Sequence, residues 1–264
     1  DLPHLVMLDD SADGALRPGK FLTAADLEDH AGEENAEFKT VLVDSVTDEL
    51  VIPDGTLGHR YGEAGLGRWN LDLHEVDPRL SLIEAGSETA LVELPRFDTP
   101  DGAADSLPRG VPIRRVGGRI VTTVFDLLLA QYGVGRDGLP GEWPSSYDDD
   151  SSPYTPAWQE KITGVPASAA ARVGREFAQN AEESKGRSMI VMGAGTNHWF
   201  HSDTIYRAFL TLTNLTGCQG VNGGGWAHYV GQEKVRALTG YTQVSNALDW
   251  VRPPRNMIQT AYWY

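Results

Sequence analysis

The stretch that most constrains the fold is SMIVMGAG, residues 188–195, a short continuous apolar run that ends in glycines. Such a run is typical of a buried parallel strand, and the glycines permit a tight turn after it. An amphipathic helix is predicted on each side, PASAAARVGREFAQNAEES entered at Pro166 and SDTIYRAFLTLTNLTG ended by Gly217. Helix, strand, glycine turn and helix predict half of a doubly wound (Rossmann-like) α/β domain.

Residues 1–134 have a different pattern of apolar and polar residues, which predicts an irregular α+β region. HLVMLD, ALVEL and IRRVGGRIVTT are short apolar runs that predict strands. LTAADLEDHAG predicts a helix over residues 22–32 that Thr23 caps and Gly32 ends. KTVLVDSVTDELVIPDG alternates apolar and polar residues around a turn, which predicts a β-hairpin.

The helix predicted over TVFDLLLAQYGV places its large apolar residues at helical spacing. These are Phe125, Leu128, Leu129 and Tyr132. The Gly, Pro and Asp residues of the following GRDGLPGEWPSSYDDDSSP predict a linker over residues 135–153. The predicted organisation is a strand-and-hairpin region 1–134, a candidate subunit-docking surface, followed by this linker and a cofactor-binding α/β region 154–264.

Composition excludes several classes of protein. A net charge of −15 argues against general nucleic-acid binding, which needs a positive surface. No apolar run approaches the roughly 18 residues of a membrane span. The single cysteine, Cys218, excludes an internal disulfide and any cysteine-built zinc or iron–sulfur site within the chain. The chain begins without methionine and ends in TAYWY, so we expect an internal segment of a longer protein.

The first candidate site is the turn GAGTNHWFHSD. Gly193 and Gly195 permit a tight turn, and the next helix, capped by Ser202 or Asp203, offers free N–H groups to a phosphate. The side chains that fill the place of a ligand head group are Asn197, His198 and Trp199. An ordinary NAD fingerprint is not favoured because His198 replaces its third glycine. A structural turn with a buried tryptophan is the alternative.

The second candidate site is GVNGGGWAHYVGQEK, where Gly223, Gly224 and Gly225 run directly into Trp226. A flexible surface loop is the simplest interpretation of a glycine run. The neighbouring aromatic and imidazole side chains instead suggest a place where backbone closely approaches a ligand. A metal site of His198, His201 and His228 is a weaker alternative, because the expected cap puts the first two before the helix. His30, His59 and His74 have no partner at metal-ligand spacing.

Six phrases together resemble one known family. They are LPHLVMLDD, TTVFDLLLAQYGV, YTPAWQEKITGVP, GAGTNHW, GGGWAHYVGQEK and ALDWVRPPR. They are similar to the catalytic subunits of molybdopterin oxidoreductases of the dimethyl sulfoxide reductase type, and GWAHYVGQEK resembles the respiratory nitrate reductase branch. The resemblance extends from residue 2 to residue 264 and is strongest after residue 120.

This resemblance implies a molybdenum bis-molybdopterin guanine dinucleotide cofactor that reduces nitrate to nitrite in anaerobic respiration. Electrons would arrive through iron–sulfur clusters, with the ligands of a 4Fe–4S cluster outside this segment. It also implies an iron–sulfur beta subunit and a membrane cytochrome subunit as partners. Association with the membrane would occur through these subunits, at the cytoplasmic face in a bacterium or the external face in an archaeon.

Matched to the family, the residues of the two turns fall on two cofactor loops. The expected cofactor-binding residues are Gly193, Gly195, Asn197, His198, Trp199, Gly217, Gly220, Gly223, Gly224, Gly225, Trp226, His228, Tyr229 and Gln232. No catalytic residue and no metal ligand is expected within the segment, whose share of the mechanism would be to position the cofactor. The rival hypotheses are a sister chlorate, perchlorate or selenate reductase, and a non-catalytic structural or docking module.

Overall fold

The structure is a computed structural model that describes residues 2–11, 14–53, 73–84, 87–96, 98 and 106–228. The chain forms two compact units, Asp1–Ala170 and Ala171–Tyr264. The first is built on a mixed β-sheet, and the second on a pair of parallel strands with helices between them. The predicted α/β fold class is therefore confirmed.

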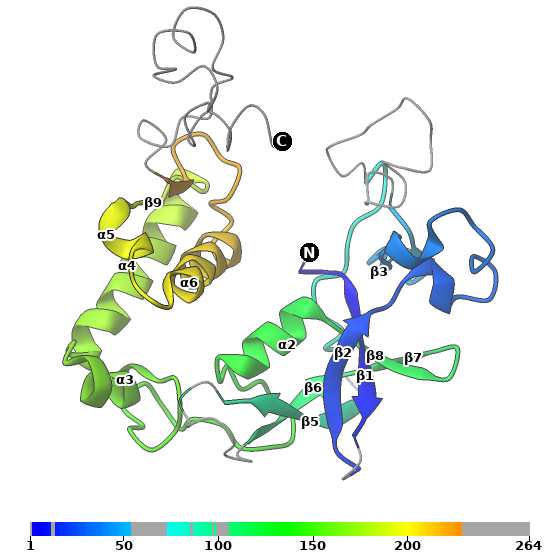
Figure 1. The fold of residues 1–264 in the computed structure, drawn as a ribbon, viewed down its shortest axis with the longest axis horizontal. Coiled ribbons are helices and arrows are strands. Elements are labelled where there is room, and N and C mark those ends of the chain that lie inside the picture. Colours follow the sequence, from blue (N-terminus) through cyan, green and yellow to red (C-terminus); the bar gives the residue numbers. More distant parts are fainter. Residues whose placement is uncertain are drawn as a thin grey trace, which may run out of the picture. The chain divides into compact units, whose positions relative to one another are not determined.

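A six-stranded sheet forms the centre of the first unit, with the order β6-β5-β2-β1-β8-β7 (Figure 1). Its strands are β1 (Leu5–Asp10), β2 (Leu16–Phe21), β5 (Thr89–Pro95), β6 (Ser106–Pro112), β7 (Arg114–Val116) and β8 (Arg119–Thr123). All neighbouring strands pair antiparallel except β2 and β5, which pair in parallel. The strands predicted over HLVMLD, ALVEL and IRRVGGRIVTT are confirmed as β1, β5 and the β7–β8 hairpin.

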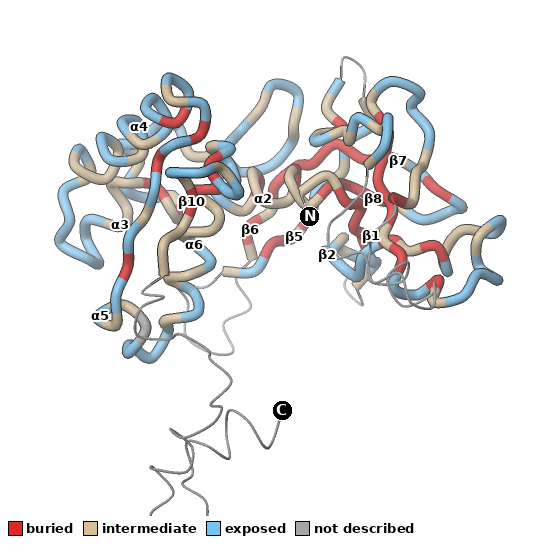
Figure 2. Tube along the Cα trace, turned by 90° about the horizontal axis from the view of Figure 1, so that it is seen from above, coloured by how far each residue is buried: buried red, intermediate tan, exposed pale blue. Residues whose placement is uncertain are grey.

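Strand β1 lies inside the sheet and is buried on both faces. Its first four residues, 5–8, are all buried (Figure 2). Leu5 and Met7 belong to one hydrophobic cluster, and Leu8 belongs to another. Successive strand residues point to opposite faces of a sheet, so one continuous apolar run supplies a core to each face.

Short elements follow the first two strands. The predicted hairpin is confirmed as β3 (Leu42–Val43) paired antiparallel with β4 (Leu50–Val51). The helix predicted over residues 22–32 is wrong, because only the 3₁₀ turn η1 (Ala24–Asp26) forms there. Thr23 caps this turn as expected, with its N–H and hydroxyl bonded to the Asp26 carboxylate at 3.1 and 3.0 Å. Ala24 alone is buried in it, and so short a segment without an apolar face is marginal as a helix.

After η1, a second 3₁₀ turn, η2 (Ala36–Phe38), precedes β3. It packs against η1. The chain between the two is a series of turns rather than the remainder of the predicted helix.

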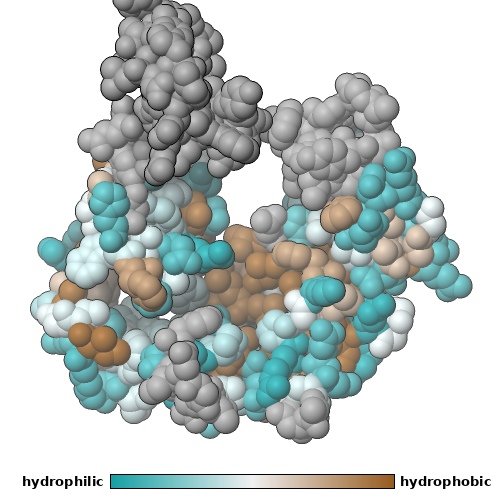
Figure 3. Space-filling model, in the orientation of Figure 1, coloured by the Kyte–Doolittle hydropathy of each residue, from teal (hydrophilic) through white to brown (hydrophobic). Residues whose placement is uncertain are grey.

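Helix α2 (Val124–Gln131) packs against β6 and β8. Its buried residues are Asp126 and Ala130, and Leu127 packs against the hydrophobic core beside them. The predicted apolar stripe of Phe125, Leu128, Leu129 and Tyr132 is therefore not the face that meets the sheet. Three of its members are half-buried and Tyr132 is exposed. Figure 3 shows apolar surface, in brown, where α2 lies. Because α2 is apolar on both sides, helical spacing alone could not choose the buried face.

The segment 135–153 is not a free linker. The buried Arg109 guanidinium donates to the Glu142 carbonyl at 3.2 Å and lies 5.7 Å from the centre of the Trp143 ring. Trp143 in turn packs against the hydrophobic core. Gly, Pro and Asp mark turns whether or not the turns pack on a sheet, which is why composition suggested a linker. The division between the compact units falls later, after Ala170.

The second unit has a helix–strand–helix–strand order. α3 (Pro156–Thr163) belongs to the first unit, and α4 (Ala167–Ser184) begins in the first unit and continues into the second. The other elements of the second unit are β9 (Met189–Val191), α5 (Ala194–Asn197), α6 (Ser202–Leu215) and β10 (Gly225–Ala227). β9 and β10 pair in parallel, and α6 packs against β10. Parallel neighbours need a crossover connection, which α6 provides here. The predicted order of helix, strand, glycine turn and helix is confirmed.

Burial of β9 differs from the prediction. Met189 is 42% exposed and Val191 is 77% exposed, and both side chains are on the same face of the strand. Within the described residues, β9 and β10 form a sheet of two strands. The continuous apolar run therefore predicted the strand and its parallel pairing correctly, but one face of it has no cover in the part of the chain that the structure describes.

His4, at the start of β1, makes a pH-dependent contribution to stability. It is 6% exposed, and burial lowers its pKa to about 4 from 6.5. The unfolded chain therefore binds more protons between these values, so the contribution is complete above pH 6.5 and is lost as the pH falls toward 4. Between about pH 7 and pH 4.5, we expect the free energy of unfolding to fall by about 2–3 kcal/mol less in His4→Gln than in the unchanged protein. Hydrogen exchange of β1 amides measures this, and equal pH slopes in both proteins would contradict it.

Candidate functional site

The first predicted cofactor loop begins at the carboxyl end of β9. Met192 is buried there, and Gly193 lies at the N-cap of α5, where its carbonyl accepts hydrogen bonds from Thr196 N and Oγ1 at 3.2 and 2.9 Å. A Cβ built on Gly193 or on Gly195 meets no atom of the described residues within 4 Å. Within the described part of the chain, neither glycine is needed for packing or for a left-handed conformation, so the loop presents open backbone there, where parallel sheets bind ligands.

Aromatic and imidazole side chains line the connection from α5 to α6. His198 and His201 are exposed, Trp199 is 70% exposed, and Phe200 is 93% exposed. The Trp199 indole N–H donates to the Gly195 carbonyl at 2.8 Å, which holds the indole beside the glycine turn. Exposed aromatic rings next to open backbone provide a surface on which a flat ligand can stack.

Helix α6 begins at Ser202, with His201 at its N-cap and no side-chain hydrogen bond at the cap. The predicted cap at Ser202 or Asp203 is therefore one or two residues too late. His198 and His201 precede the helix, as predicted. Among the residues that the structure describes, no group of three His, Cys, Asp or Glu side chains is arranged to hold a metal ion.

The second predicted loop, Gly217–Gly225, connects α6 to β10. Four of its glycines have positive φ, namely Gly217 (67°), Gly220 (84°), Gly223 (87°) and Gly225 (84°). Gly224 has another reason to be glycine: a Cβ there would lie 2.0 Å from the carbonyl oxygen of Gly186 and 2.9 Å from that of Cys218. The glycine run thus lets this loop turn tightly and press against the end of α4.

The two predicted loops lie at opposite ends of the β9–β10 pair. Because the strands are parallel, Gly225 opens β10 at the amino end, where its N–H donates to the Ser188 carbonyl at 3.0 Å. At the carboxyl end, Met192 N donates to Ala227 O at 3.1 Å. The structure therefore brings the Gly193–Trp199 loop near the end of β10, and not near the glycine run.

The remaining predicted residues divide between described and undescribed parts. Trp226 lies within β10, and His228 follows it on the same face of the strand. Tyr229, Gln232 and the side chain of Asn197 lie outside the described residues.

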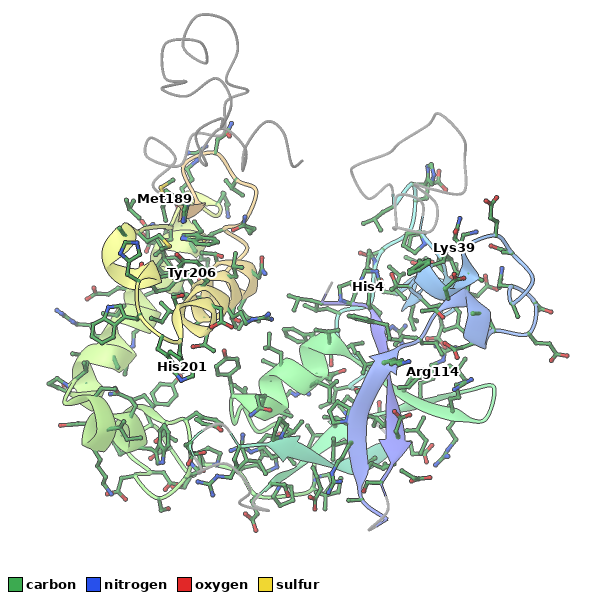
Figure 4. All side chains as sticks on the ribbon, viewed as in Figure 1. His4, Lys39, Arg114, Met189, His201 and Tyr206 are labelled. Carbon is green, nitrogen blue, oxygen red and sulfur yellow. The ribbon has the colours of Figure 1, made fainter. Side chains whose placement is uncertain are left out.

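Trp226 and His228 form an aromatic cluster with Tyr206 of α6, a residue that the sequence analysis missed. The Trp226 ring centre lies 5.0 Å from Tyr206 and 5.6 Å from His228, and Tyr206 meets His228 edge-on at 6.1 Å. Figure 4 labels Tyr206 on α6 in the second unit. Its position inside a predicted amphipathic helix was visible in the sequence, but only the pairing of β9 with β10 places the helix opposite Trp226.

The cluster contains polar atoms that a ligand would satisfy. Trp226 Nε1 and Tyr206 Oη are buried and have no hydrogen-bond partner among the described residues. Buried polar atoms in folded proteins nearly always have a partner. Two unsatisfied donors, together with the open Gly193 loop and the exposed Trp199, fit a large, flat organic cofactor that carries hydrogen-bond acceptors.

Comparison with known proteins agrees with this fit. The family model for molybdopterin oxidoreductases matches residues 24–262. The chain belongs to the molybdopterin oxidoreductase family. Family membership implies a molybdenum–pterin cofactor.

Several curated relatives match this chain. The nitrate reductase alpha subunit of Mycobacterium tuberculosis is 56% identical over the whole chain, and the respiratory nitrate reductase 1 alpha chain of Escherichia coli is 44% identical over the whole chain. The chain spans 22% of the length of each of these relatives. The perchlorate reductase subunit alpha of Dechloromonas aromatica is 42% identical over 111 residues, which cover 41% of this chain and 11% of that protein.

Proposed function

We propose that this chain is part of the catalytic subunit of a respiratory nitrate reductase, which reduces nitrate to nitrite. The observation that carries the proposal is the identity of 44–56% to nitrate reductase alpha subunits across the whole chain. The perchlorate reductase relative matches less than half of it. The segment alone is expected to be inactive, since it spans only 22% of the length of these relatives.

The role proposed for the segment is to position a bis-molybdopterin guanine dinucleotide cofactor. Gly193, Gly195 and Trp199 would contact it at the carboxyl end of β9, with Trp226 and His228 at β10. The glycine run at the amino end would hold β10 in register. The bound cofactor supplies the molybdenum centre at which nitrate gives up an oxygen atom, with electrons delivered by iron–sulfur clusters outside the segment.

The proposed partners are an iron–sulfur beta subunit and a membrane cytochrome subunit. The name of the Escherichia coli relative, respiratory nitrate reductase 1 alpha chain, supports a respiratory enzyme that contains more than one chain. No helix among the described residues is both long and apolar enough to cross a membrane. Attachment through partner subunits, at the cytoplasmic face in a bacterium, is the arrangement we propose.

The alternative substrate class is another oxyanion, because a perchlorate reductase subunit also matches residues of this chain. The test is to purify the full-length subunit with its partners and to measure kcat/KM for nitrate, chlorate, perchlorate and selenate. Preference for nitrate, with molybdenum bound, supports the proposal. Preference for perchlorate or selenate would assign the chain to the sister branch, and a metal-free, inactive chain would contradict both.

A further inference from the structure

Tyr206 and Trp226 face each other across the layer between helix and strand. Tyr206 lies on α6, which packs against β10, and the two ring centres are 5.0 Å apart with their planes tilted by 50°. His228 extends the cluster toward the carboxyl end of β10, where it meets both rings edge-on. The cluster therefore begins in the helix–strand layer and ends where the strand ends.

The burial of these two side chains is unusual in one respect. Both residues are half-buried, and their buried atoms include the polar ones, Tyr206 Oη and Trp226 Nε1. Tyrosine and tryptophan at partly exposed positions normally keep the polar tip in water and bury the ring. Here the two polar tips lose hydration without a replacement among the described residues, so the described fold gives no reason for their burial.

We propose that Tyr206 is a cofactor-binding residue whose hydroxyl, together with the Trp226 indole N–H, donates hydrogen bonds to the acceptor edge of a flat heteroaromatic ring. The proposal rests on the proposed function, in which the ring is the pterin of the cofactor. The surroundings favour a ring over a phosphate, because the donors are bordered by the faces and edges of Tyr206, Trp226 and His228. Ring nitrogens and carbonyl oxygens accept from such donors, and the neighbouring rings provide stacking.

The test is Tyr206→Phe in the full-length subunit, since this change removes only the hydroxyl. The readouts are the rate at which molybdenum and fluorescent oxidised pterin are released from the purified protein, and the melting temperature of the cofactor-free form. We expect release to be about tenfold faster, the equivalent of one lost hydrogen bond. We expect the cofactor-free form to melt at the same or a higher temperature, because an unsatisfied buried hydroxyl is gone.

Tyr147→Phe is the matched control, because Tyr147 is 67% exposed and lies in the first unit. Its release rate and melting temperature should equal those of the unchanged protein. Equal release from the Tyr206→Phe and unchanged proteins would overturn the assignment of Tyr206 and leave the proposed function intact. Absence of molybdenum and pterin from the unchanged protein would overturn both. A lower melting temperature of the cofactor-free variant would show that the hydroxyl serves the fold, and would also overturn the assignment.

Discussion

Replacing Gly224 by alanine should destabilise the β9–α6–β10 unit by about 3 kcal/mol, at the upper end of what overpacking costs. The added Cβ would lie 2.0 Å from the Gly186 carbonyl oxygen and 2.9 Å from that of Cys218. Both obstacles are backbone atoms, so no side-chain rotation relieves the overlap. Either the turn after α4 or the start of β10 must move, and Gly225 N would lose its 3.0 Å hydrogen bond to Ser188 O.

Hydrogen exchange of the β9 and β10 amides in the full-length subunit measures this effect. Gly174→Ala is the matched control, because a Cβ at Gly174 meets no described atom within 4 Å and the residue lies inside α4. That substitution should stabilise the helix by about 0.5–1 kcal/mol, since glycine is a poorer helix former than alanine. If the β10 amides of Gly224→Ala exchange as slowly as those of the unchanged protein, the close approach of Gly224 to Gly186 does not stabilise β10.

Replacing Asp126 by alanine should destabilise the first unit by about 3–5 kcal/mol, the usual cost of removing one partner from a buried ion pair. The Asp126 side chain is fully buried, and its carboxylate accepts from Arg136 at 2.7 Å, Ser81 Oγ at 2.6 Å and Leu82 N at 2.9 Å. It also accepts from Thr123 Oγ1 at 2.9 Å. Truncation leaves an uncompensated guanidinium and several donors without an acceptor, all beside the first turn of α2.

Asp150→Ala provides the comparison for Asp126→Ala. Asp150 pairs with Lys161 at 2.5 Å, but both side chains are more than half exposed. Exposed pairs contribute about 0–1 kcal/mol, so this variant should exchange amide hydrogens at nearly the original rate. Similar effects of the two substitutions on the exchange of α2 amides would refute the role assigned to the buried cluster.

Much of the fold could be predicted because the sequence pattern reports local geometry. The apolar run at residues 5–8 forms strand β1 at the predicted position. The apolar run before Gly193 forms strand β9, which pairs in parallel as predicted. The helix predicted over residues 22–32 failed because a good cap at Thr23 does not supply an apolar face. The buried face of α2 could not be predicted, since Leu127 and Leu128 are equally apolar and only tertiary packing chooses between them.

The two glycine loops of the candidate site could be predicted from the sequence, but their positions relative to each other could not. Glycine turns mark backbone freedom, but the sequence does not say what fills the space beside them. At Gly224 it is the backbone of Gly186, a contact between residues far apart in sequence. At Gly195 no described residue fills the space. The direction of β10 decides which loop lies at the carboxyl ends of the strands, and this follows only from the parallel register.

The proposed contact between the cofactor and the backbone at Gly195 is tested most directly by molybdenum content. The proteins to compare are the unchanged full-length subunit and the subunit that carries Gly195→Ala or Gly195→Leu. A Cβ at Gly195 meets no atom of the described residues within 4 Å, so the cofactor-free alanine variant should keep its melting temperature. The melting temperature of the cofactor-free leucine variant is measured beside it as the control for folding. If the cofactor lies against this open backbone, molybdenum should fall from about one per chain, modestly for alanine and at least about tenfold for leucine. Full molybdenum content in the leucine variant would show that the cofactor lies elsewhere, and would contradict the account.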